Sequence, residues 1–248
     1  MKFLGKPLAG LIASFFLGAS LLVADITVAA AASYKNALTE IARAYDDGKV
    51  ETVFAASGKL TQQIQEGAPF DIFMSADMKY PLEVEKLGLA EGAVVKSVGN
   101  KLILWSRSTD VANGLAVLND KKVKHIALAN PKTAPLGVAA MEVLQNGGAL
   151  KKVEKKLVLG ENISAATTLV ETGAADVGIT GFSVVADKIA KGEGKYAYID
   201  AKLYSPLVYG SVVLKNSKNK EEARKFMEFL RGEKAKEIFA KHGLNVTQ

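Results

Sequence analysis

The hydrophobic residues of this chain alternate between two spacings, and this alternation constrains the fold more than any other feature. Continuous apolar runs such as Ile26–Ala32 are typical of strands buried on both faces. Residues 37–45 instead place apolar side chains three or four positions apart, as a helix does. Repeated exchange of the two patterns predicts an α/β protein with mostly parallel sheets flanked by helices. Further strands are expected at 50–55, 71–74, 102–105, 125–129, 157–159, 177–180, 196–199 and 207–214, and further helices from about 60, at 77–87, 138–144, 165–170, 220–230 and 233–241.

The expected elements divide into two lobes. The segment 98–101 is the expected crossing point from one lobe to the other, and Tyr204-Ser205-Pro206 is the expected return. Residues 25–101 and 206–248 then form lobe I, and residues 102–205 form lobe II. Ligands of open α/β sheets bind beyond the carboxyl ends of the strands, so we expect the ligand cleft between the lobes.

Residues 1–24 have the pattern of a secretory signal peptide. Lys2 and Lys6 precede an apolar run from Leu8 to Val23, which is shorter than the roughly 20 residues that span a bilayer. Ala24 suits the last position before a cleavage site, although Leu22 is larger than such sites prefer. An uncleaved membrane anchor is the alternative. We expect removal of this segment and a soluble protein in the periplasm.

The composition excludes several kinds of site. The chain has no Cys and only two His, His125 and His242, so thiolate zinc sites, cysteine nucleophiles and histidine-rich metal sites are not expected. The net charge is +6, and removal of Lys2 and Lys6 lowers it to 30 − 26 = +4. This small excess does not indicate a nucleic-acid partner.

The turns from strand to helix carry the candidate binding residues. Ser33 and Ser57 each follow a strand and precede a helix, and the loops 133–137 and 161–164 lead into two more helices. Helix N-termini offer free N–H groups and partial positive charge. Taken singly, each serine reads as an ordinary N-cap. Four such turns facing one cleft would instead form a cage of neutral donors for an anion, since no Arg lies at these turns and we expect the adjacent Lys59 to be exposed.

A cage of neutral donors selects by protonation. It stabilises a fully ionised oxyanion, whereas a protonated phosphate would turn a donor toward donors at a cost of roughly 1–3 kcal/mol. Molybdate, tungstate and sulfate carry no proton at neutral pH. The site must then distinguish these three dianions by their size.

The most distinctive stretch of the chain is Gly-Ala-Pro-Phe-Asp-Ile-Phe-Met-Ser-Ala-Asp at 67–77. Together with the stretches at 26–33, 57–64, 130–137, 160–163 and 173–178, it resembles the extracytoplasmic molybdate-binding proteins of ABC importers. The resemblance covers essentially the whole chain after the signal peptide. It implies a two-lobed periplasmic-binding fold that holds dehydrated molybdate or tungstate between its lobes and delivers it to a membrane permease. We expect a monomer that needs no cofactor.

The resemblance also assigns roles in the site. Some members of the family complete it with a tyrosine hydroxyl, but here Gly181 or Phe182 stands at that position, with the hydroxyls of Thr180 and Ser183 nearby. The implied donors are the hydroxyls of Ser33 and Ser57 and the backbone N–H groups of Leu136 and Ile163.

Other functions compete with this interpretation. An enzyme is not expected, because no base accompanies a candidate nucleophile and the P-loop pattern is missing. Asp71 and Asp77 could form a carboxylate pair, but a strand end and a helix cap explain them better. Tyr204 and Tyr209 could bind ferric iron, but they flank Pro206 in a connector. The alternative that we retain is a binding protein for another tetrahedral dianion, such as sulfate or chromate.

Overall fold

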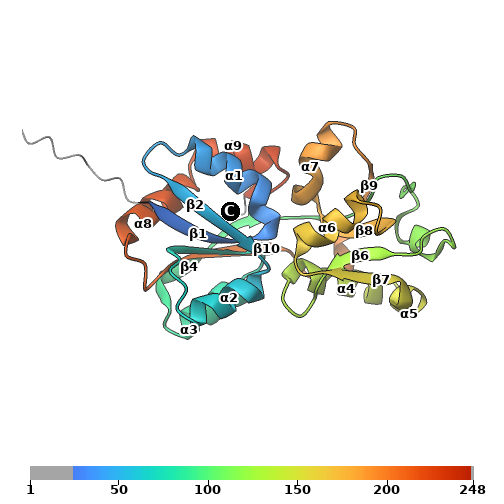
Figure 1. The fold of residues 1–248 in the computed structure, drawn as a ribbon, viewed down its shortest axis with the longest axis horizontal. Coiled ribbons are helices and arrows are strands. Elements are labelled where there is room, and N and C mark those ends of the chain that lie inside the picture. The colour runs from blue at the N-terminus through green and yellow to red at the C-terminus, as the bar shows by residue number, and fades with distance from the viewer. Residues whose placement is uncertain (1–24, 247–248) are drawn as a thin grey trace, which may run out of the picture.

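The computed structural model describes residues 25–246, so the predicted signal peptide lies outside the described residues. The described chain forms two lobes side by side, each built on one sheet (Figure 1). The strands of lobe I are β1 (Ile26–Ala31), β2 (Val50–Ala55), β3 (Ile72–Ser75), β4 (Ala90–Gly99), β10 (Val208–Leu214) and β11 (Asn245–Val246), in the order β11-β4-β10-β3-β1-β2. Those of lobe II are β5 (Leu102–Ser106), β6 (Ile126–Ala129), β7 (Leu157–Gly160), β8 (Val177–Gly181) and β9 (Lys195–Tyr198), in the order β7-β6-β8-β5-β9.

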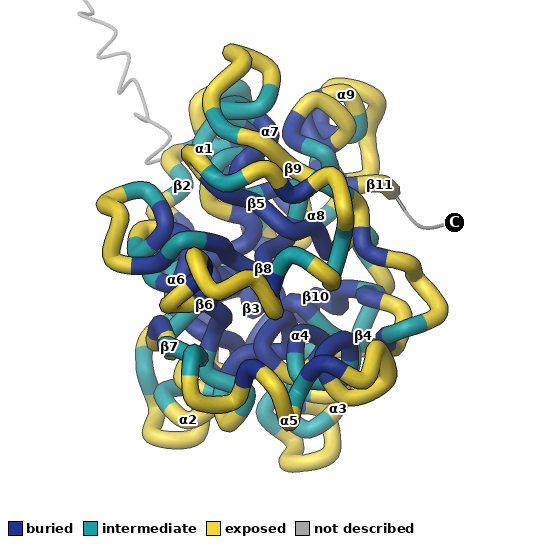
Figure 2. The backbone as a smooth tube through the Cα atoms, turned by 90° about the vertical axis from the view of Figure 1, so that its right-hand side faces the viewer, coloured by how far each residue is buried: buried dark blue, intermediate teal, exposed yellow. Residues whose placement is uncertain are grey.

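Helices flank both sheets, and burial is concentrated in the central strands while the outer turns are exposed (Figure 2). Lobe I contains α1 (Lys35–Ala44), α2 (Ser57–Gln65), α3 (Lys79–Lys86), α8 (Lys220–Phe229) and α9 (Glu233–Lys241), with the short helix η1 (Ala32–Tyr34). Lobe II contains α4 (Pro135–Asn146), α5 (Leu150–Val153), α6 (Ile163–Glu171) and α7 (Phe182–Ala190), with the short helices η2 (Gly114–Asn119), η3 (Glu154–Lys156) and η4 (Ala201–Leu203). Within residues 25–246, no helix combines the length and the apolar character needed to cross a membrane.

The two-lobed α/β architecture is as expected, but the sheets are mixed in direction, which corrects the expectation of mostly parallel sheets. Strands β2, β1 and β3 run parallel, as do β7, β6 and β8. Strand β10 is antiparallel to β3 and β4, and β5 is antiparallel to β8 and β9. Both β5 and β10 follow a passage of the chain between lobes. Their residues are buried almost throughout, so their apolar pattern does not reveal strand direction.

Strand β4 and helix α7 are the longest elements that were not anticipated from the sequence. Strand β4 has only Val98 fully buried, and its register against β10 shifts twice, so it shows no clean apolar alternation. Helix α7 buries the polar Ser183 beside Val185 and Ala186, which hides the helical spacing of its apolar residues. The predicted lobe boundaries at 101/102 and 205/206 remain a prediction.

The parallel strands place four strand-to-helix turns at matching edges. Ala31 at the end of β1 pairs with Ala55 at the end of β2, so the chain leaves both strands at the same level. In lobe II, Ala129 at the end of β6 pairs with Gly160 at the end of β7. Each lobe therefore presents two neighbouring helix N-termini beyond the carboxyl ends of its strands.

Asp71 ties three segments of lobe I together. It lies just before β3 and is 6% exposed. One carboxylate oxygen accepts from the N–H of Thr27 in β1 at 2.7 Å, and the other accepts from the hydroxyl of Ser217 at 2.6 Å. The Ser217 hydroxyl itself accepts from the N–H of Asn219, so its hydrogen goes to Asp71. The carboxylate is thus a structural acceptor between β1, β3 and the segment after β10.

Asp71→Asn is expected to lower the free energy of unfolding by about 1–3 kcal/mol, because an amide presents its NH₂ group to one of two donors and leaves it unpaired. Urea denaturation of the mature protein measures this loss. Asp46→Asn is the matched control, since Asp46 is 88% exposed and its ion pair with Lys234 is long at 3.6 Å; its effect should stay below about 0.5 kcal/mol. Equal effects of the two changes would contradict the role given to Asp71.

Candidate ligand-binding site between the lobes

A small pocket lies where the two lobes meet, and both lobes line it. The residues lining it are Ala31, Ala32, Ser33, Ala55, Ala56, Ser57 and Ala76 from lobe I, and Ala134, Pro135, Leu136, Asn162 and Ile163 from lobe II. None of these side chains is charged. The structure therefore brings together Ser33, Ser57, Leu136 and Ile163, which are distant in sequence; that they bind a ligand remains a prediction.

Ser33 supplies a hydroxyl without a partner. It follows β1 in η1, which continues into α1, and it is 2% exposed. Within the described residues its Oγ has no hydrogen-bond partner. Leaving such a buried group unpaired costs about 1–3 kcal/mol. The hydroxyl can therefore donate to a polar ligand in the pocket without breaking a bond that it already makes.

Ser57 supplies a second hydroxyl, already oriented by the protein. It is the first residue of α2, and its Oγ accepts from the N–H of Ala76 at 3.1 Å. A serine hydroxyl has one hydrogen and two lone pairs, so its hydrogen remains available for donation. The N-cap interpretation of the two serines is wrong. The N-cap positions are Ala31 for η1 and Ala56 for α2, and neither helix has a side-chain capping bond.

Lobe II supplies backbone donors. Leu136 is the second residue of α4, and Ile163 is the first residue of α6. N–H groups in the first turn have no acceptor within their own helix, and no other acceptor for these two is found within residues 25–246. Asn162 caps α6 by accepting from the N–H of Ala165 at 3.0 Å, which leaves the N–H of Ile163 unused. Both groups also carry the partial positive charge of a helix N-terminus.

The lobes touch directly at the rim of the pocket. The N–H of Gly58 donates to the carbonyl of Thr133 at 2.9 Å, and the hydroxyl of Ser164 donates to the carbonyl of Ala32 at 3.3 Å. A Cβ atom at Gly58 would lie 2.6 Å from the hydroxyl oxygen of Tyr80 and 3.1 Å from the Thr133 carbonyl oxygen. A side chain at position 58 would therefore require Tyr80 to move and the Thr133 carbonyl to shift slightly, so glycine favours this close approach of α2 to lobe II.

The position matched to the family's tyrosine provides no donor side chain. Gly181 ends β8, and a Cβ atom there would lie 2.7 Å from Cδ2 of Leu136 and 2.8 Å from the side-chain nitrogen of Asn100, so a larger side chain would require both side chains to shift. The ring of Phe182 stacks on Tyr198, with 5.6 Å between the ring centroids. Neither residue lines the pocket.

The two neighbouring hydroxyls are also engaged elsewhere. Thr180 and Thr167 share a hydrogen bond of 2.9 Å between their hydroxyl oxygens. Ser183 donates its hydroxyl to the carbonyl of Ser33 at 2.9 Å. Neither Thr180 nor Ser183 is among the lining residues, so neither replaces the tyrosine.

Tyr209 lies behind the pocket, a placement that the sequence did not reveal. Its hydroxyl accepts from the side-chain amide of Asn100 at 2.8 Å, and it approaches Ser33 without the alignment of a hydrogen bond. Burial raises the pKa of Tyr209 to about 12, against the lowering effect of Ser33 and Asn100. The phenol therefore stays neutral. Tyr204 instead accepts from the N–H of Leu102 at 3.1 Å, so the two tyrosines have separate structural partners and do not support an iron-binding pair.

Charged side chains near the pocket have structural partners or face solvent. Lys59 is exposed, as expected, and does not line the pocket. Asp77 accepts from the hydroxyl of Ser75 at 2.8 Å and from the N–H of Tyr80, in the first turn of α3, at 3.2 Å. The N-cap position of α3 is Met78 and not Asp77 as predicted. Burial raises the pKa of the Asp77 carboxyl group. Within residues 25–246, no group of three or more His, Asp or Glu residues could hold a metal ion.

Known proteins resemble the chain over nearly its whole length. A family model described as bacterial extracellular solute-binding protein matches residues 26–245. The molybdate-binding protein ModA of Azotobacter vinelandii is 37% identical over 240 residues, which cover 92% of this chain and 94% of that protein. ModA of Rhodobacter capsulatus is 34% identical over 223 residues, which cover 88% of this chain and 87% of that protein.

Solved structures agree with the sequence comparison. The periplasmic molybdate-binding protein of Azotobacter vinelandii matches with a TM-score of 0.83 and 29% identity, covering 90% of this chain and 100% of that one. The sulfate-binding protein SubI of Mycobacterium tuberculosis matches with a TM-score of 0.76 but 14% identity, covering 90% of this chain and 87% of that one, and shows the fold alone. These relatives are binding proteins and not enzymes. The chain therefore belongs to the family of bacterial extracellular solute-binding proteins.

Proposed function

We propose that this chain captures molybdate between its two lobes and delivers it to the permease of an ABC transporter. The observation that carries the proposal is a pocket lined from both lobes that contains hydroxyl and backbone donors and no charged side chain. Relatives named as molybdate-binding proteins, similar over nearly the whole chain, support the choice of ligand. The proposed donors are Ser33, Ser57, Leu136 and Ile163.

The chemistry of the donors favours an unprotonated dianion. Each hydrogen bond from a neutral donor to a charged acceptor contributes about 1.5–3 kcal/mol, and helix N-termini add favourable partial charge. Tungstate has the same charge and shape as molybdate and is the expected second ligand. No cofactor takes part and no bond is broken.

The two-lobed architecture supplies the mechanism of capture. The proposed lobes are residues 25–101 with 206–248 and residues 102–205, which the strand composition of the two sheets supports. Because donors come from both sides, the anion bridges the lobes and stabilises their closed arrangement. The proposed signal peptide at 1–24 directs the protein to the periplasm. There we expect a monomer whose partners are the oxyanion and the permease, and no nucleic acid.

A second tetrahedral dianion remains the alternative ligand. Neutral donors serve sulfate or chromate by the same chemistry, and the fold is shared with a sulfate-binding protein. The radius of the anion then determines which dianion binds more tightly, because a pocket fitted to the longer Mo–O or W–O bonds leaves sulfate with longer hydrogen bonds.

Calorimetric titration of the mature chain tests the proposal. Molybdate and tungstate should bind with clear heats, sulfate should bind more weakly, and phosphate should not bind, because its proton meets only donors. Comparable affinity for sulfate would overturn the selectivity, and no binding of any of the four anions would overturn the function.

Substitution of the two serines separates binding from stability. Ser33→Ala and Ser57→Ala should each weaken molybdate binding by roughly 10- to 100-fold, since each removes a hydrogen bond to a charged acceptor. Ser57→Ala should also lower the melting temperature, because it leaves the N–H of Ala76 unpaired. Ser33→Ala removes a hydroxyl without a partner and should leave the melting temperature unchanged or raise it.

The matched control is Ser108→Ala, at an exposed position of lobe II. It should change neither affinity nor melting temperature. If Ser33→Ala and Ser57→Ala bind molybdate as the control does, the two hydroxyls are not ligands.

A further inference from the structure

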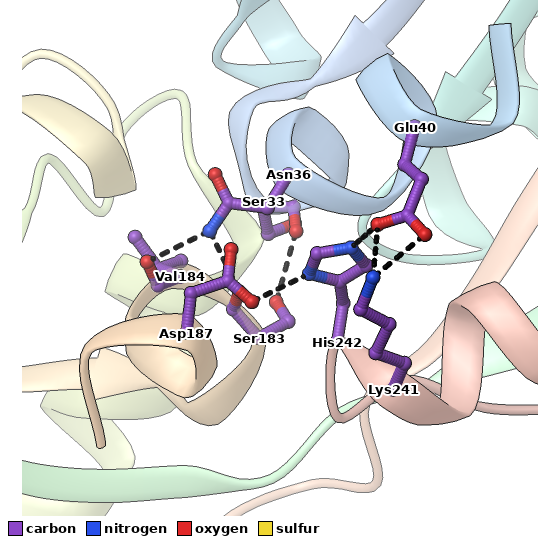
Figure 3. A network of polar contacts seen from close by, with 8 residues as sticks. All are labelled: Ser33, Asn36, Glu40, Ser183, Val184, Asp187, Lys241 and His242. Atoms are coloured by element: carbon purple, nitrogen blue, oxygen red, sulfur yellow. Dashed lines mark hydrogen bonds and ion pairs between the residues drawn. The ribbon is translucent and has the colours of Figure 1, made fainter. Parts of the chain in front are cut away.

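A cluster of ionisable residues joins the two lobes outside the pocket (Figure 3). His242 follows α9 of lobe I, and its side chain is 5% exposed. Its Nε2 lies 2.8 Å from Oε2 of Glu40 in α1, also in lobe I. Its Nδ1 lies 3.0 Å from Oδ1 of Asp187 in α7 of lobe II, as an ion pair without the alignment of a hydrogen bond. Among the ion pairs that the structure describes in this cluster, Asp187 is the partner that comes from the opposite lobe.

The charges of this cluster balance only when His242 is protonated. Lys241 donates to both carboxylate oxygens of Glu40 at 2.8 Å, so α9 supplies one fixed positive charge. Hydrogen bonds from Lys241 and His242 hold the pKa of Glu40 below its ordinary value. A neutral imidazole has one N–H and one bare nitrogen, which would face a carboxylate oxygen, whereas the imidazolium presents an N–H to each carboxylate. With the ring charged, two positive and two negative groups meet at the interface.

The cluster lies on the interface that continues to the pocket. The side-chain amide of Asn36 in α1 donates to the carbonyl of Val184 in α7 at 3.3 Å. One step nearer the pocket, Ser183 of α7 donates to the carbonyl of Ser33 at 2.9 Å. The α1–α7 contact therefore extends from the candidate ligand residue Ser33 to His242. A motion that moves α7 away from lobe I breaks both the Ser183–Ser33 hydrogen bond beside the pocket and the Asp187–His242 contact.

We propose that Asp187 and His242 form a proton-dependent clamp that holds the lobes closed and thereby sets the affinity for the anion. The proposal rests on the proposed function for the identity of that anion. Closure brings the carboxylate of Asp187 to the imidazole, so a protonated ring favours the closed form. Proton and anion then stabilise the same form, and each raises the affinity for the other.

The direction of the pH dependence follows from the groups that face the ring. Glu40 and Lys241 belong to lobe I and stay beside His242 whether the lobes are open or closed, so closure changes only the distance to Asp187. Histidine is the side chain that changes charge between about pH 5 and 8. Anion affinity should therefore be higher when the ring carries a proton and lower when it does not.

Calorimetric titration of the mature protein with molybdate at about pH 6 and about pH 8 measures the effect of the clamp on molybdate affinity. The wild type should bind roughly three- to tenfold more tightly at the lower pH, and Asp187→Asn should lose this difference by weakening only at the lower pH. The matched control is Glu171→Gln, which removes the 3.4 Å ion pair between Glu171 and Lys188 within lobe II. It should keep the pH dependence of the wild type.

A second measurement needs no anion. The chain contains no Cys, so spin labels can be placed on cysteines introduced at the exposed residues Leu87 in lobe I and Lys151 in lobe II. Electron–electron distance measurements should show a larger population of short interlobe distances at the lower pH, and Asp187→Asn should abolish the difference. Equal short-distance populations of the wild type at both pH values would overturn the clamp.

The two proposals fail in different ways. If the wild type binds no molybdate at either pH, the proposed function is overturned, and the spin-label distances still decide on the clamp. If the wild type binds molybdate and Asp187→Asn shows the same affinity and the same pH dependence, the clamp is overturned and the function stands.

Discussion

The unpaired N–H groups at helix N-termini are the constraint on which this structure depends. Every α-helix begins with N–H groups that its own carbonyls cannot reach. In a parallel sheet with crossover helices, these groups collect at the carboxyl edge of the strands. Here two sheets present such edges to one another, so Leu136 and Ile163 from one lobe meet Ser33 and Ser57 from the other. Water or an anion must satisfy these donors, and an anion that touches both lobes also holds them together.

The absence of charge from the lining of the pocket has an energetic logic. An arginine would bind any anion, protonated or not, because its attraction depends mainly on net charge. Hydroxyls and backbone N–H groups contribute less each, so several must act on one ligand before its desolvation is offset. That requirement ties affinity to the full closure of the lobes. Contacts that favour closure, such as the Gly58–Thr133 backbone bond at the rim, therefore act on affinity without touching the anion.

Much of this arrangement could be predicted from the sequence because it is local. The spacing of apolar residues and the glycine-rich turns predicted most strands and helices. A residue that directly follows a parallel strand must lie at the carboxyl edge of the sheet, so the placement of the candidate residues could be predicted too. The alternative interpretation of Ser33 and Ser57 as N-caps is wrong, because the preference of serine for caps is a statistical average over many local sequences. In the fold, Ser57 is the first residue of its helix and not the residue before it. Its hydroxyl oxygen accepts a hydrogen bond from the N–H of Ala76, nineteen residues further along the chain.

Features created by long-range packing could not be predicted in this way. The direction of β5 and β10 depends on which lobe the chain has just left, and their buried residues look alike in either direction. Tyr209 and Asn100 are 109 residues apart, and neither local sequence indicates that they form a hydrogen bond behind Ser33. His242 likewise reads as a surface residue at a helix end until the fold brings Glu40 and Asp187 to its two nitrogens.

Discrimination against protonated anions finally depends on which way the serine hydroxyls point, since a hydroxyl can accept as well as donate. Ser57 is biased toward donation because the N–H of Ala76 already occupies one of its lone pairs. The carbonyl oxygen of the Asn162 side chain also lies at the pocket, but it accepts from Ala165 as the cap of α6. Of the acceptors in the lining, the hydroxyl of Ser57 and the side-chain oxygen of Asn162 are thus committed to the protein itself, whereas the unpaired hydroxyl of Ser33 keeps its lone pairs free. The proposed selection by protonation state would therefore depend partly on hydrogen bonds that do not involve the ligand, and a substitution that frees Ser57 or Asn162 from its protein partner would weaken that selection.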